Sequence, residues 1–156
     1  MLNRFEYGTP PVPTLVVLVF GYLLSQFYRS FLAVIAPELA ADVGLDAAWL
    51  GVVSAAFFAA FAAAQIPVGA SLDRLGARRT VAGPMLLAVT GAVVVALAEA
   101  PWHSVAGMAL IGFGCAPIYM GALFVIGRTT TPARFALWSS AIVGIGSLGN
   151  LAAATP

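Results

Sequence analysis

The chain reads Gly69-Ala-Ser-Leu-Asp73-Arg74-Leu-Gly76-Ala-Arg78-Arg79 between two long apolar runs, at about 47–70 and 80–100. Each run is long enough to cross a lipid bilayer as a helix, which takes about 20 apolar residues. Gly76 permits a tight turn that a residue with a Cβ does not readily adopt. The stretch therefore predicts a charged loop that returns the chain into the membrane.

The composition of the whole chain requires lipid around it. Of its 156 residues, 62% are hydrophobic and only 8% are charged, and the mean hydropathy is +1.01. Soluble domains carry about 25% charged residues and about 45–50% apolar ones. We therefore predict an all-α polytopic membrane protein with a single membrane domain over residues 1–156. Seven scattered arginines and no Lys exclude a basic face that binds nucleic acid.

Each crossing of the bilayer must be a helix, because no water is present there to satisfy backbone N–H and C=O groups. Five such segments are expected. Their connections are short, so consecutive helices should lie antiparallel and side by side, and Asp46 is placed as the N-cap of the second. The expected spans are about 14–36, 47–70, 80–100, 102–127 and 135–155.

The arginines predict the orientation of these spans. One side of the membrane receives six of them, Arg4, Arg74, Arg78, Arg79, Arg128 and Arg134. The other side receives no Arg, and holds Glu38, Asp42, Asp46, Glu99 and His103. Cytoplasmic loops carry the excess of basic residues, so the N-terminus is expected in the cytoplasm. Arg-, Ala- and Gly-rich usage without Lys favours a GC-rich bacterium and hence its inner membrane.

Small residues recur along two of the expected spans. Ala55, Ala59 and Ala63 follow one another at intervals of four, and the fourth span contains Gly107, Gly112, Gly114 and Gly121. Small side chains let helix backbones approach closely in lipid. These two sets are therefore expected to mark helix–helix contacts.

The stretch at 69–79 resembles the loop 2–3 signature of the major facilitator superfamily, G-x-x-x-D-R-x-G-x-R-R. The preceding Gln65-Ile-Pro67-Val-Gly69 is similar to the second helix of that superfamily, while Ser71 and Ala77 depart from its usual residues. In the family, the Asp and Arg of this loop help to lock two halves of the transporter together. The resemblance thus implies gating roles for Gly69, Asp73, Arg74, Gly76, Arg78 and Arg79.

The resemblance extends to other spans, with one departure. Gly112-Phe-Gly114-Cys-Ala-Pro117 is similar to the family's fourth-helix glycine motif, but Met108 stands where some branches carry Arg. A proton-coupling role tied to that Arg therefore does not transfer. Five spans of the family's usual twelve imply an incomplete N-terminal half, whose remaining helices come from the same chain or from a second one.

Arg29 is a charge inside the first expected span. Tyr22, Ser25, Gln26 and Arg29 recur at helical spacing and form one polar stripe. A charge at this depth costs at least a few kcal/mol, so it should face the bundle interior or a wet cavity. Residues 27–37 also resemble the first helix of organophosphate and organic-anion branches, in which an Arg binds the anionic group of the substrate.

Other interpretations of these polar residues stay open. Arg29 could instead extend its stem toward the outer headgroups, or pair with an acid in the remaining helices. Gln65 either lines the same cavity as Arg29, Gln26 and Tyr22 or bonds to a neighbouring helix. His103 has no second ligand near it in the sequence, so no metal site is expected.

The function implied by the resemblance is secondary active transport of a small solute by alternating access. An organic anion is the favoured solute. Neither a cofactor nor an enzymatic activity is expected, because the sequence shows no catalytic triad, paired carboxylates or phosphate-binding loop. The alternatives are a non-transporting membrane subunit or scaffold, and a split transporter that needs a partner chain.

Overall fold

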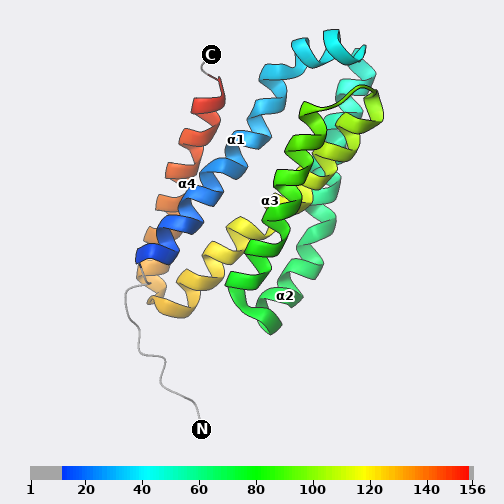
Figure 1. Cartoon of the computed structure of the whole chain (residues 1–156). Coiled ribbons are helices and arrows are strands. Elements are labelled where there is room, and N and C mark those ends of the chain that lie inside the picture. Colours follow the sequence, from blue (N-terminus) through cyan, green and yellow to red (C-terminus); the bar gives the residue numbers. More distant parts are fainter. Residues whose placement is uncertain (1–11, 155–156) are drawn as a thin grey trace.

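The computed structural model describes residues 12–154, and these are almost entirely helical (Figure 1). Four helices make up this part of the chain, and each is long and apolar enough to cross a membrane. The prediction of an all-α polytopic membrane protein is therefore confirmed. The helices are α1 (Val12–Val43), α2 (Ala47–Ala96), α3 (Pro101–Thr129) and α4 (Pro132–Ala154).

Helix α2 contains two of the predicted spans, so residues 12–154 form four helices where five were expected, although all five helical spans are present. Helical structure continues on both sides of Gly76, which alone has non-helical angles, φ 75° and ψ 168°. These angles lie in a region that essentially only glycine occupies. Because one residue reverses the chain, no separate loop is needed, and most of the predicted charged loop is helical. We call residues 47–75 the first limb of α2 and residues 77–96 the second limb.

The end of α1 also differs from the prediction. The helix continues through Pro37 and past the expected end at residue 36. A proline inside a helix loses one backbone hydrogen bond, which membrane helices tolerate. The helix stops at Val43, where Gly44 has a φ of 71° and the N–H of Leu45 donates to the carbonyl of Ala40 at 3.0 Å. This glycine in the left-handed conformation is a common helix stop.

Helix α3 packs against both limbs of α2. Gly112 and Ala116 lie against residues of the first limb, and Gly107 and Gly114 lie against the second limb. The order of these contacts makes α3 parallel to the first limb and antiparallel to the second. Helix α1 packs chiefly on α4 and has few contacts with α2. Helices α3 and α4 also share few contacts. The expectation that all consecutive helices are neighbours is therefore wrong for α1 and α2 and holds only weakly for α3 and α4.

Glycines create the closest helix contacts, as predicted. A Cβ on Gly91 would lie 2.5 Å from the carbonyl oxygen of Gly107, and a Cβ on Gly112 would collide with the carbonyl oxygen of Phe57. On α4, Gly149 lies equally close to the carbonyl of Leu23. The alanine set of the first limb behaves differently, because the side chains of Ala55, Ala59 and Ala63 are exposed. That face packs on no helix among residues 12–154.

The close contact at Gly112 leads to a prediction about stability. Gly112→Ala should lower the free energy of unfolding by about 1–3 kcal/mol, because the added methyl group must push α3 away from the backbone of Phe57. The matched control is Gly51→Ala on the first limb, where a Cβ meets nothing within 4 Å. The control should be neutral or slightly stabilising. Unfolding in a titration with dodecyl sulfate measures both variants, and equal stabilities would contradict the packing described here.

The turns of the bundle separate by charge. In Figure 1 the break in α2 and the α3–α4 connection lie at one end, and the α1–α2 and α2–α3 connections lie at the other. The first end carries Arg74, Arg78, Arg79, Arg128 and Arg134. The other end carries Glu38, Asp42, Asp46 and Glu99. We call these the arginine end and the acidic end.

At the acidic end, the Asp46 carboxylate accepts a hydrogen bond from the N–H of Trp49 at 2.8 Å, so the predicted N-cap is confirmed.

The charge separation predicts which end faces the cytoplasm. A reporter enzyme that is active only in the cytoplasm should work when fused after Arg79 and fail when fused after Asp42, because basic turns stay inside. Activity of the two fusions in intact cells measures this directly. If only the Asp42 fusion were active, the acidic end would face the cytoplasm and the predicted orientation would be wrong.

Candidate solute-binding site

The polar stripe of α1 faces several helices at once. The Tyr22 ring packs against Gly146 of α4 and lies 5.0 Å from the ring of Tyr119 of α3, centroid to centroid. Gln26 and Ser25 are buried, whereas Arg29 is exposed. Part of the stripe is therefore buried between helices, whereas Arg29 lies on the open side of the bundle.

Gln26 is a buried polar side chain without a partner. Its side chain is only 8% exposed, and its Oε1 atom accepts no hydrogen bond among the described residues. Its Cβ lies beside Gly149, in the contact between α1 and α4. A buried amide oxygen without a donor costs about 1–3 kcal/mol. Gln26 is thus able to accept a hydrogen bond from a donor that enters the bundle.

Arg29 reaches across to the first limb of α2. Its guanidinium carbon lies 5.3 Å from the ring centroid of Phe61 and 5.9 Å from that of Phe58. Both distances fall within the range of cation–π attraction. Because Phe61 lies at the middle of the first limb, about 20 Å of helix rise from the limb's start, the charge is held at mid-height in the bundle.

Arg29 lines a hollow of about 250 Å³ between α1, the first limb and α3. Most of the lining is apolar, with Ser54 of the first limb as a further polar side chain. The described lining residues include no acid. The other lining residues are Leu32, Ala33, Ala36, Leu50, Phe57, Phe58 and Met108. We call this the arginine hollow.

The structure brings together only part of the predicted site. Of Tyr22, Gln26, Arg29 and Gln65, only Arg29 lines the arginine hollow. Gln65 is half-buried on the first limb, next to the small cluster formed around Ala64. Sequence reasoning missed the aromatic and small lining residues of the first limb. Their regular spacing on one face was visible, but phenylalanine and serine carry no signal that separates a cavity wall from a lipid-facing surface.

The predicted gating residues lie around the break in α2. Asp73 and Arg74 precede Gly76, and Arg78 and Arg79 follow it; all four side chains are exposed at the arginine end. A Cβ added to Gly69 would meet no neighbouring helix within 4 Å among the described residues. Within residues 12–154, this surface is therefore open to a further helix.

This arrangement defines a polytopic α-helical membrane protein with a cationic hollow between its helices. A family model described as Major Facilitator Superfamily matches residues 18–155. The chain therefore belongs to the major facilitator superfamily, and it is a membrane transporter of that class rather than an enzyme. No curated protein and no solved structure matches the chain.

Proposed function

We propose that this transporter is a secondary active carrier that moves a small organic anion by alternating access, with Arg29 holding the anionic group. The position of Arg29 carries the proposal: the residue lines a hollow of about 250 Å³, and its guanidinium lies against Phe58 and Phe61 at mid-height in the bundle. A charge at that depth is expensive and is characteristic of a functional site. A guanidinium also binds a carboxylate or phosphate through two parallel hydrogen bonds.

Two other roles for Arg29 predict different surroundings. An arginine that extends toward the headgroups would direct its guanidinium to the acidic end, but Arg29 lies over Phe58 and Phe61. A structural ion pair within residues 12–154 would need an acid at the hollow, and the described lining residues include none. The first observation favours a solute anion over headgroup contact, and a pair with an acid on further helices is separated from a solute anion by the uptake measurement.

We further propose that the residues around Gly76 control the conformational change. The exposed carboxylate of Asp73 lies at the arginine end, far along α2 from the arginine hollow. A carboxylate there is able to meet an Arg or the positive end of a facing helix. Such contacts, together with those of Arg74, Arg78 and Arg79, would form in one state of the carrier and break in the other.

The proposal includes the setting of the chain in the cell. We place it in the inner (plasma) membrane with the arginine end in the cytoplasm, following the charge asymmetry. Further helices, from the same chain or from a second one, would close the exposed side of the arginine hollow. Arg29 is exposed among the described residues, and burial by such helices would exclude water and strengthen its contact with an anion.

Uptake by proteoliposomes tests the proposal. The protein expressed from its full gene is reconstituted, and entry of radiolabelled benzoate, phenyl phosphate, benzylamine and benzyl alcohol is compared with entry into empty liposomes. Saturable uptake of an anion, absent for the amine and the alcohol, is the expected result. Saturable uptake of the amine alone would reject an anion as the transported solute. If the protein moved none of the four solutes, the role of a non-transporting subunit or scaffold would be favoured.

A further inference from the structure

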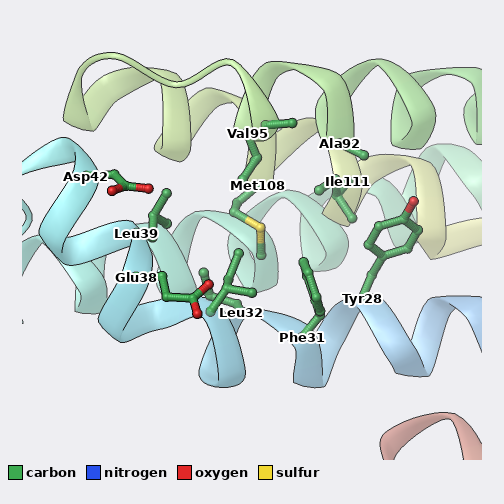
Figure 2. A pocket seen from close by; sticks show the side chains of 12 residues that line it. Tyr28, Phe31, Leu32, Glu38, Leu39, Asp42, Ala92, Val95, Met108 and Ile111 are labelled. Carbon is green, nitrogen blue, oxygen red and sulfur yellow. The ribbon is translucent and has the colours of Figure 1, made fainter. Parts of the chain in front are cut away.

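A second hollow lies next to the arginine hollow, nearer the acidic end of the bundle. It measures about 290 Å³, lies between α1, the second limb of α2 and α3, and is open on one side. Figure 2 shows its walls, with the Met108 side chain of α3 directed toward Leu32 and Glu38 of α1. Most of its lining is apolar, including Phe31, Leu39, Val95 and Ile111. Leu32 and Met108 line both hollows, so they form the partition between them.

Two carboxylates stand at this second hollow. Glu38 and Asp42 are one helical turn apart on α1 and both line it. They lie near the C-terminal end of α1, where the helix dipole adds negative potential and where the last turn has no basic residue. Arg29 does not line this hollow, and it precedes Glu38 by nine residues, about 13 Å of helix rise. The two negative charges are therefore not neutralised by a described cation on the hollow's wall.

This combination specifies the chemistry of an occupant. An apolar wall excludes a strongly hydrated ion such as a free metal cation, and no described group of three or more His, Cys, Asp or Glu side chains could hold one. The carboxylates favour a positive charge at one edge only. The volume is near the lower limit of about 300 Å³ for ligand pockets, so the occupant must be compact.

We propose that this acidic hollow binds a small hydrophobic amine. The ammonium group lies between Glu38 and Asp42, and the apolar body packs against Leu32, Met108 and Ile111. Met108 suits such a site because its flexible thioether adapts to different shapes. The site is separate from the anion site at Arg29, and the inference does not rest on the proposed function.

Binding of 2-phenylethylamine tests this assignment. The full-length protein is placed in nanodiscs of zwitterionic lipid, and calorimetric titrations are corrected with empty nanodiscs. The uncharged analogue 2-phenylethanol has the same apolar body, and 3-phenylpropanoate reverses the charge. The variants are Glu38→Gln, Asp42→Asn and their combination. Glu99→Gln is the matched control, because Glu99 is also exposed at the acidic end but does not line the hollow.

The amine should bind at least fivefold more tightly than the alcohol, and the acid should not bind. Each single substitution should weaken amine binding up to about fivefold, and the combination roughly tenfold, because partly exposed charge pairs contribute up to about 1 kcal/mol each. Glu99→Gln should bind as the unchanged protein does. Equal binding of amine and alcohol would overturn the proposal and indicate an apolar hollow filled by a lipid chain. Full affinity in the folded double variant would overturn it as well.

A substitution on the opposite wall keeps the test valid if the acidic variants unfold. Ala92 of the second limb lines the hollow, and Ala92→Leu would reduce its volume without changing a charge. This variant should lose amine binding while its unfolding transition stays cooperative. Undiminished binding in folded Ala92→Leu would place the amine elsewhere and reject the site.

Discussion

Arg29→Lys should weaken binding of the transported anion by about 30-fold to several-thousand-fold, which corresponds to a loss of roughly 2–5 kcal/mol. A lysine ammonium keeps the charge but cannot form the two parallel hydrogen bonds of a guanidinium. It also loses the planar contact with Phe58 and Phe61, 5.9 and 5.3 Å from the guanidinium carbon. Binding to the purified protein and initial uptake rates in proteoliposomes measure the effect.

The control for this variant is Arg128→Lys. Arg128 also lies over an aromatic ring, with its guanidinium carbon 4.3 Å from the centroid of Phe124, but it belongs to the last turn of α3 at the arginine end. Its replacement should leave binding within about twofold. Near-normal uptake by Arg29→Lys would show that any long cation suffices, which is the result expected of an arginine that only extends toward the headgroups.

Asp73→Asn should reduce the uptake rate by about 10-fold to 150-fold, the range for losing a charged hydrogen bond of 1.5–3 kcal/mol. Solute affinity should change much less, because Asp73 lies at the arginine end beside the break in α2 and does not line the arginine hollow. Uptake and equilibrium binding are measured on the same preparation, so that conformational cycling and affinity are separated.

An exposed carboxylate at the opposite end provides the comparison. Glu99→Gln removes the same charge at the acidic end and should leave uptake near normal. If Asp73→Asn lost affinity but cycled at the normal rate once saturated, Asp73 would belong to the binding site and its gating role would be rejected.

The class of fold could be predicted from the sequence because lipid imposes simple rules. Long apolar runs, the glycines of α3 and the N-cap at Asp46 each have a local physical cause, and the structure contains all three. The way in which the chain reverses within α2 was harder to predict from the sequence. Gly76 permits a turn, but only its backbone angles show that one residue makes the reversal without a loop.

The choice of helix neighbours could not be predicted from the spans. Helix α1 packs on α4 because Gly146 and Gly149 accept Tyr22 and the backbone of Leu23. This fit depends on the shapes of two surfaces that lie more than 100 residues apart in the chain. Short connections limit where a helix starts, but they do not decide which face it buries.

The candidate site was predictable where polarity reveals it and not elsewhere. Arg29 was evident from its cost in lipid, whereas Phe58 and Phe61 resemble any other aromatic in a membrane helix. The polar stripe of α1 spans roughly 100° of the helix, so its members face different neighbours. Tyr22 and Gln26 therefore meet α4, while the longer side chain of Arg29 reaches the first limb of α2.

The charge preference of the arginine hollow shows most directly whether Arg29 makes it an anion-binding site. Ser54 lines that hollow, and Ser54→Cys is made in a background in which Cys115 and every cysteine of the further helices are replaced by Ala. The introduced cysteine is modified with an anionic reagent, 2-sulfonatoethyl methanethiosulfonate, and with its cationic trimethylammonioethyl counterpart. Each modification rate is divided by the rate at which the same reagent modifies free cysteine. The anionic reagent should be favoured roughly tenfold, and Arg29→Gln should abolish this preference. Equal normalised rates with Arg29 present would contradict an anion-binding hollow.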